Sequence, residues 1–448
     1  MPPTRSFQGP KGTRDFYPDR MAVLRHIQSA WRSASIDSGF SEIEGPMFEP
    51  LELYTVKSGQ EIVSQLFSFR REGGEDDYAL RPEFTPTLAR MAAARGKSLG
   101  VPTKWFSIPN LFRAERPQRG RLREHVQWNV DVLGLDDASA DVEVISTALL
   151  ALERLGLGPH HIKVRLSHRE SIAEVLVALG VSREHLQDAF LLMDRRDKID
   201  EDAFRQGVAK LGLDEAAISR FDQAARLTRT LDQPLDDVAE ALGVPKSALS
   251  GLQEVTARLR EAGLADWCVV DTGIIRGLAY YTGSVFEIFD AQGEERAVAG
   301  GGRYDRLIEL FGGPSTPACG FGMGDVVLSL VLEQHGLLGE SGGESLLPRP
   351  DVFLVATGDE GERLYDRLLT TLRRAGIHAR RTHKSTRNLG KLLSEATKLN
   401  ARHAVVLGDE LAEGSVILKD LDGGSQREVK LEELPSILVA LVREGQDS

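Results

Sequence analysis

The sequence predicts an α+β protein in which a helical block interrupts a β-rich body and a small α/β domain follows. Three patterns indicate this fold class. Polar and apolar residues alternate over 125–132, residues 170–262 have almost continuous helical periodicity, and strand and helix patterns alternate after residue 350. Alternation with a period of two is typical of a half-buried strand, and recurrence near 3.6 residues is typical of an amphipathic helix.

These patterns divide the 448 residues, which are many for a single domain, into five segments. The predicted limits are 1–169 and 263–336 for the two parts of the body, 170–262 for the insertion, 337–350 for a Gly- and Ser-containing linker, and 351–448 for the small domain. In the body we expect helices at 20–38, 140–155 and 324–335, and strands at 39–46, 161–166, 268–290, 296–304 and 318–323.

Two further strands are expected between residues 104 and 134, around an arginine-rich turn. On the second of them, Gln127, Asn129 and Asp131 share one face, while the opposite face is apolar and includes Trp128 and Val130. Since successive side chains of a strand point to opposite faces, this segment predicts an antiparallel sheet with one packed face and one polar face.

The small domain reads as a regular alternation of strands and helices. Strands are predicted at 351–355, 377–381 and 404–407, and helices at 360–375 and 387–399. Between residues 373 and 391 there are seven basic residues and no acidic one (Arg373, Arg374, Arg380, Arg381, Lys384, Arg387 and Lys391). This run predicts an RNA-binding face, and the alternative is an ordinary solvated surface.

Composition excludes several classes of protein. The net charge of −12 opposes indiscriminate binding to nucleic acid, so an RNA partner would need local basic patches. Two cysteines exclude a disulfide framework, and no apolar run approaches the length of a membrane helix. The first seven residues lack the apolar core of a signal peptide. We therefore expect a cytoplasmic protein with no membrane partner.

The first candidate site is the arginine-rich segment that begins with Arg113. Arg113 and Glu115 would point to one face of a strand, and further arginines follow at 116, 119, 121 and 123. A guanidinium group pairs bidentately with phosphate or carboxylate oxygens. The alternative, a solvated turn with surface ion pairs, is weakened by Gln127 and Asp131 on the adjacent strand.

Two other segments carry candidate ligands for a zwitterion. Glu83 and Thr85 could receive an ammonium group, although a helix that starts at Thr85 explains them equally well. Arg276 precedes two tyrosines and Glu287, and the alternative there is a core strand with aromatic residues at its edge. Glycines at 283 and 300–302 would allow a ligand to approach the backbone closely. The histidines lack zinc spacing, and no metal site is predicted.

Taken together, these segments resemble the histidyl-tRNA synthetases, which have the class II fold. The resemblance is carried by Pro46 and by residues 11–15, 80–85, 112–131, 276–287 and 300–305. Residues 400–408 and 418–421 look like the anticodon-binding module of that family. The resemblance implies a six-stranded antiparallel sheet with flanking helices, and a homodimer joined near Pro46. It also implies that ATP, as the magnesium complex, activates L-histidine for transfer to tRNA(His).

The resemblance also implies roles for individual residues. Arg113 and Arg276 would be catalytic, both at the phosphate under attack. Histidine would be bound by Glu83, Thr85, Gln127, Asp131, Tyr280 and Tyr281, with Asp131 and Tyr281 at the imidazole nitrogens. ATP would be bound by Arg113, Glu115, Arg121 and His125.

The chain departs from the family pattern at four positions. Val327 stands where an arginine usually covers ATP, and His125 where an aromatic residue stacks on adenine. Asp131 replaces a common glutamate, and Ala279 a common aspartate. The first two departures favour an alternative in which the fold persists as an RNA-binding sensor without ATP. A histidine-binding regulatory subunit of ATP phosphoribosyltransferase is disfavoured by the C-terminal module and the intact arginine-rich segment.

Overall fold

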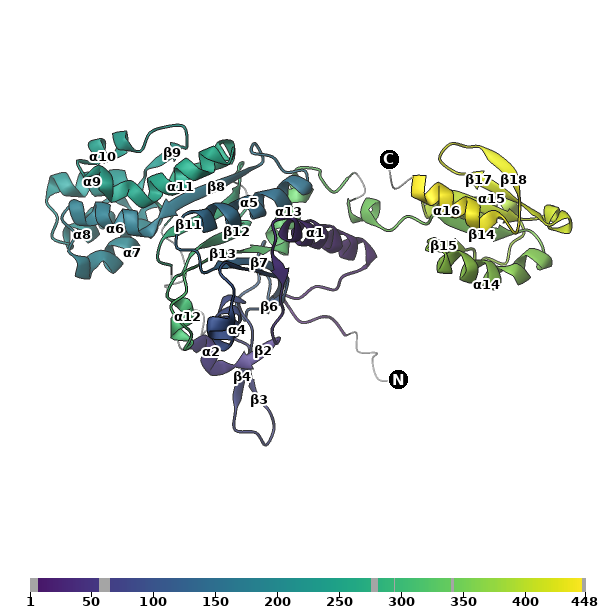
Figure 1. Cartoon of the computed structure of the whole chain (residues 1–448), viewed down its shortest axis with the longest axis horizontal. Coiled ribbons are helices and arrows are strands. Elements are labelled where there is room, and N and C mark those ends of the chain that lie inside the picture. The colour runs from purple at the N-terminus through teal and green to yellow at the C-terminus, as the bar shows by residue number, and fades with distance from the viewer. Residues whose placement is uncertain (1–6, 56–64, 275–280, 294, 340–341, 445–448) are drawn as a thin grey trace. The chain divides into compact units, whose positions relative to one another are not determined.

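The computed structural model describes residues 7–55, 65–274, 281–293, 295–339 and 342–444 (Figure 1). The chain divides into two compact units, residues 1–346 and 347–448, and each is described by itself. Two of the predicted site residues, Arg276 and Tyr280, lie outside the described residues.

The first unit is built on one large sheet whose six central strands are all antiparallel. In spatial order these are β5 (Thr103–Ser107), β7 (Glu124–Leu133), β13 (Ala318–Gly324), β12 (Ala299–Arg303), β11 (Ser284–Asp290) and β8 (Ile162–His168). Two strands add in parallel, β1 (Ser41–Glu42) to β5 and β10 (Cys268–Asp271) to β8. The antiparallel sheet expected from the sequence is therefore confirmed, as the centre of a larger mixed sheet.

One face of this sheet is packed beneath three helices, α1 (Pro18–Asp37), α5 (Ser139–Arg154) and α13 (Asp325–Gln334). Trp128 on β7 stacks on Trp31 of α1 with ring centroids 5.9 Å apart, and its indole N–H donates to the Ser35 hydroxyl over 2.9 Å. Val126 and Val130 are buried in the same core. Because side chains alternate along a strand, the polar residues of β7 must face the other side.

The arginine-rich segment differs from its prediction in local structure. The first expected strand is two pieces, β5 and β6 (Asn110–Phe112), with Pro109 between them, a residue that has no N–H to donate to a ladder. Strand β6 ends at Phe112, so Arg113 and Glu115 follow the strand instead of sharing its face. The Arg113 N–H still donates to the Arg123 carbonyl over 2.8 Å, and the Ala114 N–H donates to the carbonyl of Gln65 over 2.7 Å.

Residues 170–262 are mostly helical. They contain α6 (Arg169–Ala178), α7 (Leu186–Asp194), α8 (Glu201–Ala209), α9 (Glu215–Ala225), α10 (Asp236–Leu242) and α11 (Ser250–Glu261), which gather at one end of the sheet (Figure 1). A short strand that the sequence pattern did not reveal, β9 (Thr228–Thr230), pairs with β10. This pairing joins the insertion to the sheet that carries the polar face.

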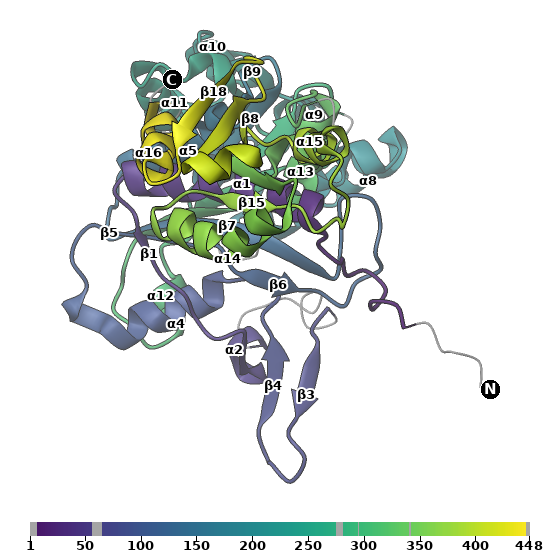
Figure 2. The ribbon, with the colours of Figure 1, turned by 90° about the vertical axis from the view of Figure 1, so that its right-hand side faces the viewer.

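A second, small sheet projects from the body in both views (Figures 1 and 2). Its strands are β2 (Phe48–Pro50), β4 (Asp77–Leu80) and β3 (Ser68–Arg70), and beside it lie α2 (Leu51–Thr55), α4 (Thr85–Arg95) and α12 (Leu307–Leu310). Residues 342–346, within the predicted linker, form a short 3-10 helix that contacts α1.

The second unit has a five-stranded sheet in the order β15 (Ala379–Arg381), β14 (Val352–Ala356), β16 (His403–Leu407), β17 (Ser415–Asp420) and β18 (Gln426–Lys430). The first three strands are parallel and are the strands that the sequence predicts. Helices α14 (Asp359–Arg374), α15 (Leu389–Lys398) and α16 (Leu434–Glu444) flank the sheet (Figure 2). The antiparallel strands β17 and β18 were not expected.

Candidate functional site

Two cavities meet on the polar face of the large sheet. The larger has a volume of about 960 Å³ and the smaller about 140 Å³. Four residues line both: Arg113, Gln127, Gly300 and Gly322. A ligand that reached from one cavity into the other would therefore pass beside the Arg113 guanidinium.

The smaller cavity brings together the described residues that the sequence assigns to histidine. Glu83, Thr85, Gln127, Asp131 and Tyr281 all line it. At roughly 10–15 Å³ per water-sized group, 140 Å³ accommodates about as many atoms as a small amino acid contains. The cavity thus fits a small polar molecule in size and in lining.

Glu83 and Thr85 reach this cavity from the start of a helix. Helix α4 begins at Thr85 with Pro86 in its first turn, so the helix-start interpretation is correct and an extended segment is not observed. Glu83 is nevertheless buried against the cavity, where its carboxylate can meet a cation.

Asp131 is an acid of the smaller cavity with a strongly shifted pKa. It is 4% exposed, and burial raises the pKa of its carboxyl group to about 7, although a hydrogen bond from the Tyr304 hydroxyl opposes that rise. Desolvation also raises the pKa of Tyr281 and keeps its phenol protonated. Tyr281 therefore offers the cavity a hydroxyl donor, and Asp131 offers it a carboxyl group that titrates near neutrality.

Glycines on β13 make room for the polar side chains of β7. Gly320 pairs with Asp131 in the ladder, and a Cβ atom at Gly320 would lie 2.1 Å from the Asp131 Oδ1. A Cβ atom at Gly322 would lie 2.4 Å from the Gln127 Nε2. Since real side chains essentially never approach so closely, only glycine allows the Asp131 and Gln127 side chains to lie across this strand.

The larger cavity contains the residues that the sequence assigns to ATP. Arg113, Glu115, Arg121 and His125 all line it. The Arg113 Nε donates to the Pro82 carbonyl over 3.0 Å, and Arg121 donates to the Glu115 carboxylate. These contacts fix two guanidinium groups at one end of the cavity.

His125 lies beside these cations and is uncharged at neutral pH. Burial lowers its pKa to about 3, with further lowering by Arg113 and Arg14. A neutral imidazole ring is flat and can stack on a nucleobase without repelling the neighbouring arginines.

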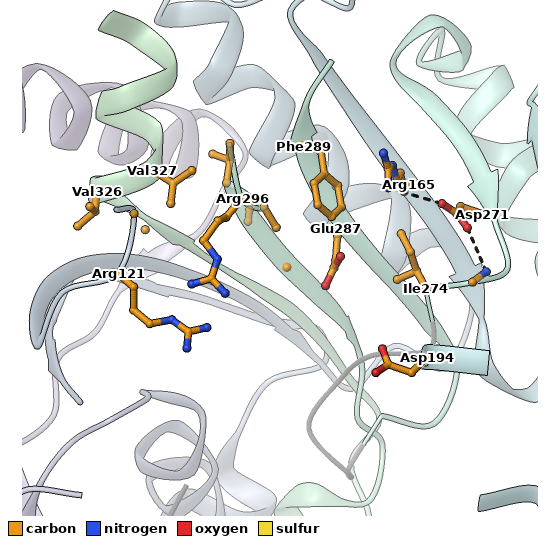
Figure 3. A pocket seen from close by; sticks show the side chains of 18 of the residues that line it. Arg121, Arg165, Asp194, Asp271, Ile274, Glu287, Phe289, Arg296, Val326 and Val327 are labelled. Carbon is orange, nitrogen blue, oxygen red and sulfur yellow. Dashed lines mark hydrogen bonds and ion pairs between the residues drawn. The ribbon is translucent and has the colours of Figure 1, made fainter. Parts of the chain in front are cut away.

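The opposite end of the larger cavity reaches the insertion. Met193, Asp194, Arg196, Lys198 and Arg226 line it there, and all five follow or belong to the insertion helices. Arg165 on β8 and Asp271 on β10 also line this end, with a 3.9 Å ion pair between them (Figure 3). Carboxylates pair with the other cations here as well, Asp222 with Arg196 and Arg226, and Asp194 with Lys198.

Three residues that the sequence analysis did not assign to the site also line these cavities. Asn129 shares the polar face of β7 and accepts a hydrogen bond from Gln127 over 2.7 Å. Tyr304 contacts Asp131, and Arg296 lines the larger cavity. Asn129 was detectable from its position on the polar face, whereas the other two lie far from β7 in the sequence.

In the second unit, acids from other segments neutralise part of the predicted basic run. Arg387 pairs with Asp359 and Lys384 with Glu395, Arg381 stacks on Tyr365, and Arg373 donates to the Ala379 carbonyl. Three of the seven cations, Arg374, Arg380 and Lys391, are exposed and stand outside these pairings. They lie on three elements, Arg374 at the end of α14, Arg380 on β15 and Lys391 on α15, and α14 and α15 pack on opposite faces of the sheet.

Within the described ranges, no cluster of three or more histidine, cysteine or acidic side chains has a geometry that could bind a metal ion. None of the helices described is both long and apolar enough to span a bilayer.

Comparison with known proteins places both units in defined families. A family model described as histidyl-tRNA synthetase matches residues 12–325, and one described as anticodon binding domain matches residues 351–441. The histidine–tRNA ligase of Opitutus terrae is 38% identical over 437 residues, which cover 97% of this chain and 98% of that protein. The chloroplastic/mitochondrial histidine–tRNA ligase of Arabidopsis thaliana is 35% identical over 426 residues, 95% of this chain and 85% of that protein.

The fold agrees with these matches. The crystal structure of histidyl-tRNA synthetase from Nostoc sp. PCC 7120 superposes with a TM-score of 0.79 at 25% identity, and the match covers 97% of this chain and 99% of that one.

Proposed function

We propose, from the premise that this chain belongs to the histidyl-tRNA synthetase family and is a histidine–tRNA ligase, that its smaller cavity binds L-histidine and its larger cavity binds ATP. One observation carries this assignment: Arg113 lines both cavities at the place where they meet. The carboxylate of the amino acid and the α-phosphate of the nucleotide would come together there.

Histidine would lie with its ring deep in the smaller cavity. Asp131 and Tyr281 would hydrogen-bond the two ring nitrogens, and Glu83, Thr85 and Gln127 would bind the ammonium group. Tyr280 and Arg276 keep their proposed roles at histidine and at its carboxylate. Buried polar partners for both ring nitrogens would reject apolar amino acids by about 10⁴-fold, because such amino acids would leave those partners unpaired.

Activation would be a displacement at phosphorus. A histidine carboxylate oxygen forms a bond to the α-phosphorus, the bond from that phosphorus to the bridging oxygen breaks, and pyrophosphate leaves with the electron pair. Such a step requires positioning and charge neutralisation more than a general base. Arg113 would supply positioning and charge neutralisation from one side of the α-phosphate, and Arg276 would supply them from the other side.

ATP would place its base against His125 and its phosphates near Arg121. The cavity also fits the magnesium ion that accompanies ATP, since this ion commonly binds through one or two carboxylates together with substrate phosphates. Glu287 lines the same cavity and its carboxylate projects into it (Figure 3), so we assign it to that ion. When bound, the ion would neutralise charge on the phosphates.

The tRNA would make two contacts with the chain. Its terminal ribose would enter the larger cavity from the insertion, where Arg196, Lys198 and Arg226 lie. A ribose hydroxyl oxygen would form a bond to the histidyl carbonyl carbon, the bond from that carbon to the phosphate oxygen would break, and AMP would leave with the electron pair. Its anticodon would bind the second unit, where the exposed cations Arg374, Arg380 and Lys391 lie on three different elements. Unpaired bases, read at their edges, would supply the specificity.

The small projecting sheet would join two copies into a homodimer. Met47, Phe48 and Phe69 are 49%, 48% and 44% exposed on or beside it, and Phe48 packs edge-on to Phe69 with centroids 5.8 Å apart. An exposed aromatic group of this kind commonly marks a protein interface. It adjoins Pro46, where the family resemblance locates the dimer.

We place the protein in the cytoplasm.

The assay is histidine-dependent exchange of labelled pyrophosphate into ATP. Wild-type protein should support exchange, and Arg113→Ala should lower its rate by about 10²- to 10³-fold, the usual effect of removing one donor to a developing charge. The Arg113→Ala protein should still bind histidine. Exchange that persists at the wild-type rate in Arg113→Ala would refute the assignment of Arg113.

One observation favours a second candidate, an RNA-binding sensor that has lost the reaction with ATP. Val327 lines the larger cavity where the family resemblance leads us to expect an arginine. No exchange by the wild-type protein, with histidine binding retained, would select this alternative.

A further inference from the structure

The larger cavity has an apolar wall at Val327. This side chain, on the first turn of α13, is only 8% exposed and carries no charge for a phosphate. The triphosphate of ATP concentrates negative charge, which a cation must offset in a partly closed cavity. The question is therefore whether another cation reaches the same region.

Arg296 reaches it from a different part of the fold. It lies in the connection between β11 and β12, three residues before β12 begins, and it lines the larger cavity. Its guanidinium group and that of Arg121 project into the same end of the cavity from two different segments, and Val327 lies beside Arg296 (Figure 3).

The contacts around Gly120 confirm that these residues are neighbours. A Cβ atom at Gly120 would lie 3.4 Å from the Val327 Cγ2 and 3.6 Å from the Arg296 Cδ. Gly120 has a φ of +72°, a conformation that residues with side chains rarely adopt. The glycine thus allows the arginine-rich turn to pass beside both Arg296 and Val327.

An ion pair holds the two segments together. Arg119 donates to the Glu295 carboxylate through Nε over 2.9 Å and also through Nη2. Arg119 is two residues before Arg121, and Glu295 immediately precedes Arg296. The Glu295 side chain is 4% exposed in this pair, so the contact is partly shielded from water. The ion pair keeps the backbone near Arg121 close to the backbone near Arg296.

We propose that Arg296 provides the cation that Val327 does not, and that Arg121 and Arg296 together bind the terminal phosphates of ATP. This proposal rests on the proposed function, and it names the residues that would bind the phosphates of the nucleotide. Two planar guanidinium groups that approach from different segments can each pair with phosphate oxygens. Pyrophosphate, which contains the same two phosphates, should depend on both arginines as well.

The test compares four variants with the wild-type protein in the pyrophosphate exchange assay. They are Arg296→Ala, Arg296→Lys, the double variant Arg296→Ala/Val327→Arg, and Arg260→Ala. Arg260 is an exposed arginine on α11 that lines neither cavity, and it controls for the loss of one positive charge. The quantities measured are the KM values for ATP, pyrophosphate and histidine, and the maximal rate.

Arg296→Ala should raise the KM values for ATP and pyrophosphate by about 10- to 100-fold, the range for loss of a charge-assisted hydrogen bond. The KM for histidine should stay within about twofold of wild type, which also shows that the fold is intact. Arg296→Lys should be intermediate because it keeps the charge but loses the planar fork. Val327→Arg should recover part of the ATP affinity in the Arg296→Ala background.

Three results would overturn the proposal. Unchanged KM values for ATP and pyrophosphate in Arg296→Ala, with an active wild type, would remove Arg296 from the site while leaving the proposed function standing. A parallel rise in all three KM values would indicate a structural effect on the whole site. No recovery by Val327→Arg would mean that the two positions do not serve the same ligand group. A wild type without exchange would instead reject the proposed function itself.

Discussion

Tyr304, the residue after strand β12, donates a hydrogen bond from its hydroxyl group to the carboxylate of Asp131 on strand β7. The two strands are not neighbours, because β13 lies between them. Gly320 on β13 pairs with Asp131, and the Asp131 carboxylate occupies the space where a side chain at position 320 would begin. The contact across three strands therefore depends on a glycine in the middle one.

This arrangement predicts that Gly320→Ala damages histidine binding. The added methyl group would meet the Asp131 Oδ1 at 2.1 Å and the Val130 carbonyl at 2.6 Å, so Asp131 must move. We expect the KM for histidine to rise by at least about tenfold, as for a lost hydrogen bond to a charged group. Gly324→Ala is the matched control on the same strand, because a Cβ atom there meets nothing within 4 Å. An unchanged histidine KM in Gly320→Ala would contradict the role of Asp131.

Histidine binding should also depend on pH through Asp131. Burial raises the pKa of this carboxyl group to about 7, so the free protein holds a proton there below neutrality. An ionised carboxylate accepts a hydrogen bond from a ring N–H, and the KM for histidine should therefore fall as the pH rises from 6 to 8. Free histidine titrates near pH 6.5 as well. The Asp131→Asn variant separates the two contributions to the pH dependence. In that variant the KM for histidine should vary with pH only through the titration of free histidine.

The same shift has a consequence for stability, with a defined sign. A carboxyl group whose pKa is about 7 when folded and about 4 when unfolded stabilises the fold below pH 4 and loses that contribution as the pH rises to 7. Asp131→Asn should accordingly melt at a higher temperature than wild type at pH 8, and at a similar temperature at pH 4. Equal melting temperatures at pH 8 would show that the pKa is not raised.

The strands of the sheet and their polar and apolar faces could largely be predicted from local sequence pattern. The contacts between side chains of different strands could not. The alternation around Trp128 and Val130 is a property of one strand, and it correctly assigned Gln127 and Asp131 to the polar face. The pairing of Asp131 with Tyr304 requires the order of β7, β13 and β12, which no local pattern contains. Strand β9 was missed for a related reason, since its three residues have strand character only through their pairing with β10.

Local pattern has the same limit in the arginine-rich segment at the larger cavity. Arg113 and Arg121 were assigned from their own neighbourhood, and both line the larger cavity. The prediction that Arg113 lies on a strand was wrong, since β6 ends at Phe112. The Ala114 N–H donates to the carbonyl of Gln65, a distant residue that no local pattern reveals. Arg296 was not found because its approach to Arg121 depends on contacts between segments far apart in the sequence.

Arg303 anchors the end of strand β12 that leads to Tyr304. It is 8% exposed and donates to Asp141 over 2.6 Å and to the Asp137 carbonyl over 2.7 Å. Arg303→Ala would leave Asp141 buried without its partner, at a cost of about 3–5 kcal/mol in the free energy of unfolding of the first unit. Urea unfolding measures this loss. The double variant Arg303→Ala/Asp141→Ala should be less destabilised than the sum of the two single variants, and simple additivity would contradict a direct pair.

The exposed cations of the second unit predict a defined effect on RNA binding. Arg380 lies exposed on the edge strand β15, and Arg427 lies exposed on the opposite edge strand, β18. Arg380→Ala should weaken binding of tRNA(His) and reduce the slope of log affinity against log salt by about one, as for one lost phosphate contact. Arg427→Ala removes the same charge and should leave the slope unchanged. Equal effects of the two would indicate a general charge effect and no defined RNA face.

The most direct measurement is a crystal structure with a non-hydrolysable analogue of histidyl-adenylate. The account predicts the imidazole ring between Asp131 and Tyr281, the phosphorus within hydrogen-bonding reach of Arg113, and the adenine against His125. An analogue bound with its phosphate away from Arg113, or with its imidazole outside the smaller cavity, would contradict the claim that activation takes place where the two cavities meet.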